Sequence, residues 1–288
     1  MSGSPLDGIR VVALDLDGTL LPSDKRVSDL AKRVVRDLQG AGIVPILATG
    51  RGWNSTAVYA QELALDGPLV TFEGALVAFA GARDGVARPV AERHLHNRTL
   101  GADLIGSTVR AIGDLEIGWF VCTDAGRTVV SRRVLEPRLD QVAVWDQNIH
   151  FVDGWTPAEE RGYILHLVGP PGDVSEARAR VHALAFDGVE CFHAAFWDGY
   201  DQFQIRPRGI GKDAGLRRVL EHLGLGPEHL LAAGDWHNDT EMLRMARVAV
   251  APANAVDEIR ALAHHVLPGT NDDDAVVAFL DDALARRA

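Results

Sequence analysis

The sequence predicts an α/β protein whose parallel-sheet domain is split by an inserted α+β module. In residues 1–81 short apolar runs alternate with amphipathic helical segments, and the same alternation resumes from about Phe203. Between these parts, turn-forming sequences separate short strands in the manner of hairpins. Repeated strand–helix–strand units favour a parallel sheet with right-handed crossovers. We therefore expect a core domain from residues 1–81 and 202–288, and an inserted domain over residues 82–201.

The first segment contains three expected strands and two expected helices. Ser28 has the side chain of a helix N-cap, and a stripe of apolar residues follows it as far as Gly40. A second helix is expected to be capped by Asn54 or Ser55 and to end near Leu65. The strands are expected over residues 9–14, 43–48 and 69–72.

The inserted and final segments differ in pattern. Turn sequences at residues 82–85 and 124–127 predict hairpins in the inserted domain. Its helices are expected near residues 100–112 and 174–186, and its strands near 117–122, 163–168 and 189–193. In the final segment we expect helices over residues 213–223 and after Asp272, and strands over residues 230–233 and 248–251.

Charge and composition argue against several classes of partner. The chain has 288 residues, 47% hydrophobic and 24% charged, as is typical of a globular protein. Its net charge of −11 argues against non-specific binding to nucleic acids or anionic membranes, since both need a positive surface. No apolar run has the length of a membrane span, and the N-terminus lacks the pattern of a secretion signal. Because there are only two cysteines, Cys122 and Cys191, we expect a reducing, cytoplasmic location.

The most informative motif is Asp15-Leu16-Asp17-Gly18, which directly follows the first expected strand. Residues two apart on a strand share a face, so Asp15 and Asp17 point the same way where the strand ends. Gly18 then allows a sharp turn. Two carboxylates this close repel each other unless a cation lies between them or one carries a proton. The pair therefore predicts a metal site or a nucleophile beside a general acid, although one Asp could be only a turn or capping residue.

Further polar residues follow the other expected strands of the core. Because open parallel sheets bind ligands at the carboxyl ends of their strands, we expect these residues to converge with Asp15 and Asp17. A nucleophile, an acid, a hydroxyl, a cation and metal-binding carboxylates form the set that phosphoryl transfer needs. Taken singly, Thr49 could mark only a strand exit, and Lys212 could be a surface lysine. The converging residues are Thr49, Arg51, Lys212, Asp235, Asn238 and Asp239.

Taken in order along the chain, these motifs resemble those of the haloacid dehalogenase-like superfamily, and more narrowly its Cof-like phosphatases with a large inserted cap. The resemblance covers nearly the whole chain and implies a Rossmann-like parallel-sheet core with an inserted α+β cap domain. The matching segments are Asp15–Leu21, Ala48–Arg51, Gly209–Lys212 and Gly234–Asp239, with weaker echoes at Ala251–Ala255 and Thr270–Asp274.

The resemblance implies a role for each matched position. Asp15 would attack phosphorus and form an aspartyl phosphate, while Asp17 would protonate the leaving alcohol and then activate water. Thr49 and Lys212 would hold phosphate oxygens. Mg²⁺ would be bound by Asp15, by Asp235 and by the main-chain carbonyl of Asp17, since an all-oxygen shell suits this hard ion. The metal-site candidates are Asp15, Asp17, Asp235 and Asp239, and the substrate-binding candidates are Gly18, Gly50, Arg51, Asn238, His193 and Trp197.

Three positions leave alternatives open. Glu73 stands where the family often has Asn, and its carboxylate could repel a phosphate, pair with Arg51 or face solvent. Asp213 replaces a common Gly, and an acidic residue there suits the first turn of a helix. His237 invites a zinc interpretation, because His and carboxylates bind zinc, but its oxygen-rich surroundings favour Mg²⁺.

The expected function is that of a Mg²⁺-dependent phosphatase acting on a small phosphorylated metabolite, such as a sugar phosphate, a nucleotide or a phosphorylated cofactor. A phosphomutase is one alternative, because an aspartyl phosphate can pass its phosphoryl group to a second hydroxyl. The other alternative is a catalytically idle binding or regulatory module. The complete set of Asp15, Asp17, Lys212 and Asp235 counts against that alternative.

Overall fold

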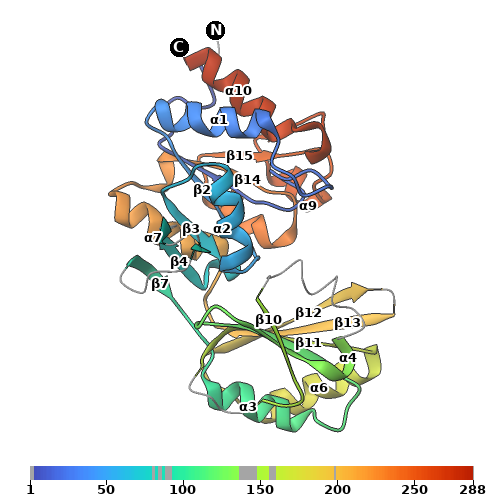
Figure 1. Cartoon of the computed structure of the whole chain (residues 1–288). Coiled ribbons are helices and arrows are strands. Elements are labelled where there is room, and N and C mark those ends of the chain that lie inside the picture. The colour runs from blue at the N-terminus through green and yellow to red at the C-terminus, as the bar shows by residue number, and fades with distance from the viewer. Residues whose placement is uncertain are drawn as a thin grey trace. The chain divides into compact units, whose positions relative to one another are not determined.

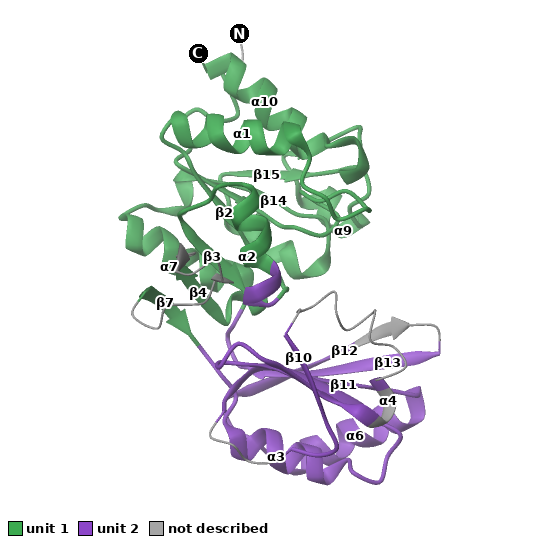
Figure 2. Ribbon diagram, viewed as in Figure 1, with its two compact units in different colours: residues 1–51, 56–97, 211–288 green, residues 52–55, 98–210 purple. Residues whose placement is uncertain are grey.

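The computed structural model describes residues 3–79, 82–83, 86–87, 93–135, 148–155, 160–197 and 199–287. The chain divides into two compact units. The first unit comprises residues 1–51, 56–97 and 211–288, and the second comprises residues 52–55 and 98–210 (Figure 2). The predicted fold class is confirmed, because a parallel-sheet core is accompanied by a second domain with a mixed sheet.

A five-stranded parallel sheet, which includes β2, β14 and β15, forms the centre of the first unit (Figure 1). Its strand order is β16-β15-β14-β1-β2. Its central strands are apolar throughout and buried, as expected for a parallel sheet that is covered on both faces. The order runs in opposite directions on either side of β1, so a topological switch point lies between β1 and β14. The strands are β1 (Val11–Leu14), β2 (Val44–Leu47), β14 (Leu230–Ala233), β15 (Val248–Ala251) and β16 (His265–Val266).

In the part of the chain that the structure describes, six α-helices accompany this sheet. Ser28 caps α1 as expected, because its side-chain oxygen accepts a hydrogen bond of 3.0 Å from the main-chain nitrogen of Ala31. The second helix begins at Trp53, so Asn54 and Ser55 lie inside its first turn and the predicted caps are wrong. The helices are α1 (Asp29–Gly40), α2 (Trp53–Glu62), α7 (Lys212–Leu223), α8 (Thr240–Met245), α9 (Asp257–Leu262) and α10 (Ala275–Arg287).

The third expected strand, β3 (Pro68–Thr71), begins a small antiparallel sheet with β4 (Leu76–Phe79) and β7 (His94–Asn97). A single parallel bridge between Ala48 and Val70 joins β3 to the end of β2. Strands β5 (Ala82–Arg83) and β6 (Val86–Ala87) pair antiparallel on either side of the predicted turn, whose central residues lie outside the described part of the chain.

The second unit contains a six-stranded mixed sheet in the order β10-β9-β8-β11-β13-β12. Helices α3 (Ala102–Ala111) and α6 (Pro171–Ala183) pack on one face, where they share an apolar cluster with alternate residues of β11 (Figure 1). On the other face Phe120, Val130 and Val168 pack around Leu135 of the short helix α4 (Arg132–Leu135). The strands are β8 (Gly118–Thr123), β9 (Thr128–Ser131), β10 (Ile149–Val152), β11 (Gly162–Gly169), β12 (Val189–Trp197) and β13 (Tyr200–Pro207).

The chain passes from one compact unit to the other near residues 98 and 211, not at the predicted boundaries of 82 and 202. Strand β7 pairs with β4 and therefore groups with the first unit. Strand β13 pairs with β11 and β12 and therefore groups with the second unit. Hydrogen-bonded strand pairing, which sequence periodicity does not reveal, accounts for both differences.

Within the described residues, we find no helix with the length and apolar character needed to cross a membrane.

Candidate active site

The predicted catalytic residues of the core gather where β1 and β14 end side by side. Leu14 pairs with Ala233 in the parallel register, so both strands end at the same level. Asp15 follows Leu14 directly, and its main-chain nitrogen donates a 3.1 Å hydrogen bond to the carbonyl oxygen of Ala233. Asp235 follows two residues after Ala233. The switch point of the sheet therefore carries two carboxylates from segments far apart in the sequence.

Lys212, the first residue of α7, lies between two buried carboxylates. Its Nζ is 2.6 Å from Asp15 Oδ1 and 2.7 Å from Asp239 Oδ1. All three side chains are buried, and that of Lys212 is only 1% exposed. Burial by itself would lower the pKa of Lys212, but the charges of Asp15 and Asp239 raise it well above its usual range. The lysine is therefore a fixed cation, not the surface residue of the alternative interpretation.

Asp15, Asp235 and Asp239 form a group of carboxylates able to hold a cation. One oxygen from each lies within 4.8 Å of the others. Burial raises the pKa of Asp15 well above its usual range, against the opposing effect of Lys212. Burial and the nearby charge of Asp239 raise the pKa of Asp235 to about 6. An oxygen-only donor set with excess negative charge fits Mg²⁺, whereas zinc sites use mainly His and Cys.

The loop that carries Asp235 is anchored by the same cluster. Asp239 Oδ2 accepts hydrogen bonds from the main-chain nitrogens of Asp235 (3.0 Å) and Trp236 (3.1 Å). Thr19 Oγ1 donates a 3.0 Å hydrogen bond to Asp235 Oδ1. Because both Asp239 oxygens have partners, this residue holds the loop and Lys212 in place. His237 points away to Glu258, at 3.0 Å, and its side chain is 59% exposed.

The turn after Asp17 requires glycine and is held by two distant asparagines. Gly18 has a φ of +80°, and a Cβ at this position would collide with Asp235 Oδ2. Asn254 Nδ2 donates a 2.7 Å hydrogen bond to the Gly18 carbonyl oxygen. Asn271 Nδ2 donates a 2.8 Å hydrogen bond to the Leu21 carbonyl oxygen. The main-chain nitrogen of Asn271 donates a 2.9 Å hydrogen bond to Asn254 Oδ1, which links the two asparagines. The segments Ala251–Ala255 and Thr270–Asp274, which resemble the family motifs only weakly, therefore hold the loop that follows Asp17 in place.

Asp17 is held by two cations. Arg51 Nε lies 2.6 Å from Asp17 Oδ2 and Arg51 Nη2 lies 2.7 Å from Oδ1, which is a two-point ion pair. Lys25 Nζ lies 2.8 Å from Oδ1. Burial by itself would raise the pKa of Asp17, but the contacts with Arg51 and Lys25 lower it to about 2. Arg51 also lies over the ring of Tyr59, 5.1 Å from its centroid.

Thr49 and Glu73 complete the edge of the site. Thr49 is buried, and its Oγ1 accepts a 3.1 Å hydrogen bond from the main-chain nitrogen of Arg51. Glu73 Oε1 accepts a 2.9 Å hydrogen bond from Asn238 Nδ2. A Cβ added to Gly50 would collide with the same oxygen of Glu73. The sequence left open whether Glu73 repels a phosphate, pairs with Arg51 or faces solvent. The structure shows that its carboxylate lies beside Gly50 and accepts a hydrogen bond from Asn238.

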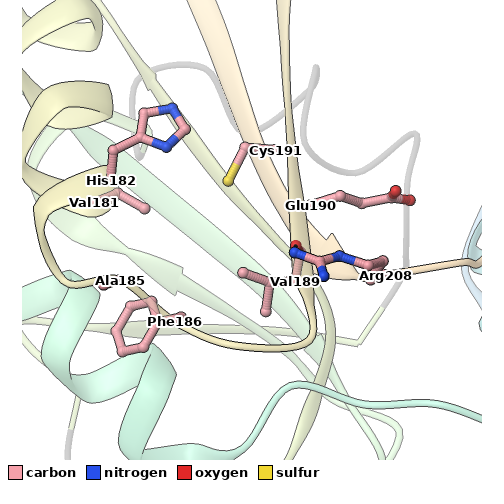
Figure 3. Close-up of a pocket in the computed structure, with 8 residues that line it drawn as sticks. All are labelled: Val181, His182, Ala185, Phe186, Val189, Glu190, Cys191 and Arg208. Atoms are coloured by element: carbon pink, nitrogen blue, oxygen red, sulfur yellow. The ribbon is translucent and has the colours of Figure 1, made fainter.

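Two predicted substrate-binding residues, His193 and Trp197, belong to the second unit. His193 on β12 is 45% exposed and lies 2.8 Å from Asp201 Oδ2 through its Nε2. The side chain of Trp197 lies outside the described part of the structure. A cavity of about 340 Å³ in this unit lies between the end of α6 and the start of β12, with Cys191, His182 and Arg208 among its lining residues (Figure 3).

Sequence reasoning missed Lys25, Thr19 and Asn254 as contributors to the site. Thr19 lies within the first motif and could have been considered, since its hydroxyl follows the turn glycine. Asn254 lies in a segment noted only as a weak echo. Lys25 carries no pattern that would single it out in the sequence.

Known proteins resemble this chain over nearly its whole length. A family model for haloacid dehalogenase-like hydrolases matches residues 12–280. The 5-amino-6-(5-phospho-D-ribitylamino)uracil phosphatase YitU of Bacillus subtilis is 27% identical over 94% of this chain and 96% of its own length. The pyridoxal phosphate phosphatase YbhA of Escherichia coli is 27% identical over 94% of this chain and 97% of its own length. A crystal structure of a haloacid dehalogenase-like hydrolase from Bacteroides thetaiotaomicron shares the fold, with a TM-score of 0.79, 21% identity and coverage of 95% of this chain and 99% of that chain.

The parallel-sheet core, its acidic edge and these relatives define an enzyme that hydrolyses phosphoric monoesters. The chain belongs to the haloacid dehalogenase-like hydrolase family. The resemblance inferred from the motifs and the expectation of an enzyme are both confirmed.

Proposed function

We propose that this protein is a Mg²⁺-dependent phosphatase that hydrolyses a small phosphorylated metabolite through an aspartyl phosphate on Asp15. The observation that carries the proposal is the buried cluster in which Lys212 Nζ lies 2.6 Å from Asp15 Oδ1, beside Asp235 and Asp239. A carboxylate at the carboxyl edge of a parallel sheet, flanked by a fixed cation and further acidic groups, can attack phosphorus while the charge of the phosphoryl group is neutralised.

In the first step a carboxylate oxygen of Asp15 forms a bond to phosphorus as the bond to the leaving oxygen breaks. Lys212 and the Thr49 hydroxyl would bind non-bridging oxygens and align the phosphoryl group. Asp17 would give its proton to the leaving oxygen, which departs as an alcohol. In the second step Asp17 would take a proton from water as the water oxygen bonds to phosphorus. Orthophosphate leaves, and the Asp15 carboxylate is regenerated.

The contacts of Asp17 with Arg51 and Lys25 favour its role as a base in the second step and oppose its role as an acid in the first. With Arg51 and Lys25 bound to it, the low pKa of Asp17 keeps it ionised, which is the form a base needs. The acid of the first step has to carry a proton. A bound phosphate ester offers Arg51 and Lys25 another anion, so we infer that substrate binding loosens their hold on Asp17.

The metal would be held by the side chains of Asp15 and Asp235 and by the main-chain carbonyl of Asp17. When bound, Mg²⁺ would neutralise charge on the phosphoryl oxygens. Asp239 and Thr19 keep Asp235 and its loop in position for this role. Asn238, which follows on the same loop, would contribute to the phosphate site.

The named relatives act on a phosphorylated ribitylaminouracil and on pyridoxal phosphate, both small phosphate esters. We propose a substrate of this size class, chosen in part by the inserted domain, with His193 and Trp197 as candidate contacts. A cytoplasmic location, expected from composition, suits such a metabolite.

A panel of phosphorylated metabolites, assayed for orthophosphate release with and without Mg²⁺, tests this proposal. We expect turnover of at least one ester and of a generic aryl phosphate, Mg²⁺ dependence, and loss of turnover in Asp15→Asn. Full activity of that variant would refute the nucleophile assignment. Tracing a labelled phosphoryl group distinguishes the mutase alternative, which returns a rearranged ester in place of orthophosphate.

A further inference from the structure

Glu73 lies at the end of β3 in a backbone conformation that side chains rarely adopt. The φ angles of Phe72, Glu73 and Gly74 are +51°, +55° and +85°. Only glycine adopts this left-handed region without steric cost, so two non-glycine residues here must be held by their surroundings. The main-chain nitrogen of Phe72 donates to the Arg51 carbonyl oxygen (2.9 Å), and that of Glu73 donates to the Thr49 carbonyl oxygen (3.2 Å). The loop is thus fixed to the loop that carries Thr49.

Gly74 brings Glu73 against the start of α7. A Cβ at Gly74 would collide with the carbonyl oxygen of Gly211, the residue that precedes Lys212. Only a glycine permits such close contact between two backbones. The loop after β3 is therefore packed directly against the helix end that carries the buried lysine.

The Glu73 carboxylate lies among the groups assigned above to the phosphate. Its Oε1 accepts the 2.9 Å hydrogen bond from Asn238 Nδ2 and occupies the space beside the α-carbon of Gly50. Its charge also acts on Lys212: burial lowers the pKa of that lysine, and the charges of Asp15, Asp239 and Glu73 raise it. A carboxylate and a phosphate are both anionic oxygen acceptors, so they compete for the same donors.

We propose that Glu73 acts as an internal anion at the phosphate site, competing with the phosphate of substrate and product for Asn238 and for the positive field of Lys212. This inference rests on the proposed phosphatase function. It assigns Glu73 a positioning role, because it would act on the phosphate through these two residues. Glu73 acts on the phosphoryl group, which every substrate shares. It therefore lowers the affinity of the site for all phosphate esters and favours the release of orthophosphate.

Glu73→Gln is the sharpest test, because it removes the charge but keeps an oxygen that can accept from Asn238 and the same side-chain length. Orthophosphate is titrated into wild-type protein and variant by calorimetry in the presence of Mg²⁺. We expect the dissociation constant to fall by roughly tenfold, since one adjacent charge changes an ionic equilibrium by ~10-fold or more. KM for phosphate esters should fall by a similar factor, with kcat unchanged or lower, because the competition that Glu73 exerts acts on bound substrate and product alike.

Two further variants separate charge from structure. Glu228→Gln makes the same change in the short helix Pro227–His229, at the amino end of β14 and so at the opposite edge of the sheet. It should leave orthophosphate binding unaltered. Glu73→Asn also removes the charge but suits the left-handed backbone, so it should tighten binding as Glu73→Gln does while raising the melting temperature.

The outcomes distinguish this proposal from the proposed function. If the wild type hydrolyses esters but Glu73→Gln binds orthophosphate equally or more weakly, the role of Glu73 is refuted and the phosphatase assignment stands. If no ester is hydrolysed, the titration still reports on Glu73, and tighter binding in the variant supports it. Equal tightening in Glu228→Gln, or no binding in any variant, overturns the proposal.

Discussion

The Asp235 carboxylate should destabilise the metal-free protein at neutral pH, and replacing it with Asn should raise stability. Burial and the nearby Asp239 raise the pKa of Asp235 from 3.8 to about 6. A carboxyl group whose pKa is raised on folding favours the folded state while it is protonated. That contribution is complete below the unfolded pKa and is lost as the pH rises through about 6.

The size of the effect follows from the shift. A difference of about two pKa units corresponds to about 3 kcal/mol, at about 1.4 kcal/mol per unit. Asp235 keeps some contact with water, which reduces this effect, so we expect about 1–2 kcal/mol at pH 7.5. For a protein of this size, that is an increase of about 2–8 °C in the thermal midpoint of Asp235→Asn. Asn keeps the Oδ1 that accepts from Thr19, so the 3.0 Å hydrogen bond need not be lost.

Thermal melts of wild type and Asp235→Asn in chelator, at pH 7.5 and at pH 4.5, measure this difference. The gain should be largest at pH 7.5 and clearly smaller at pH 4.5, where Asp235 of the folded wild type is already protonated. Mg²⁺ should stabilise the wild type at pH 7.5 and have little effect on the variant. Asp257→Asn serves as the control, because it makes the same substitution at a side chain that is 93% exposed. Lower stability of Asp235→Asn at pH 7.5, or a gain that does not depend on pH, would contradict the reasoning.

Three further substitutions test other parts of the site. Lys212→Met leaves Asp15 and Asp239 buried without their cation, so chemical denaturation at pH 7.5 should show a free energy of unfolding lower by about 3–5 kcal/mol. Unchanged stability would argue against a buried ion cluster. Asn254→Ala removes the hydrogen bond to the Gly18 carbonyl and should reduce kcat by about ten- to a hundredfold, because small displacements of catalytic groups have large effects. A kcat equal to that of the wild type would show that the turn keeps its conformation without this bond. Asp17→Asn should impair hydrolysis of alkyl phosphates far more than that of aryl phosphates, whose leaving groups need no proton, and equal losses in the two steady-state assays would exclude the acid role.

Much of the core and of its catalytic edge was predictable from the sequence, because parallel strands impose their geometry on whatever follows them. The segments after β1 and β14 must converge once those strands pair, so Asp15 and Asp235 could be placed together from their positions alone. The N-cap at Ser28 was predictable for a similar reason, since its hydrogen bond to Ala31 is local in sequence.

The contacts between side chains were not predictable in the same way. The Arg51–Asp17 ion pair depends on the reach of a long side chain, and strand periodicity says nothing of it. The hydrogen bond from Asn254 to Gly18 joins residues 236 positions apart, with no motif that links them. Glu73 was left with several alternatives because its position depends on an unusual backbone conformation at Phe72 and Glu73.

The charge of the buried cluster connects the stability of the fold to its chemistry. Asp15, Asp235 and Asp239 contribute three negative charges when ionised and Lys212 contributes one positive charge, so the cluster retains two negative charges. A divalent cation bound there would neutralise that excess and, under the proposed mechanism, lower the repulsion that an approaching phosphate dianion meets. The buried, uncompensated charge that makes Asp235→Asn stabilising in chelator is therefore the same charge that would hold Mg²⁺ in the proposed enzyme. A variant that is more stable without metal should, for this one physical reason, be the variant that can no longer bind metal or substrate.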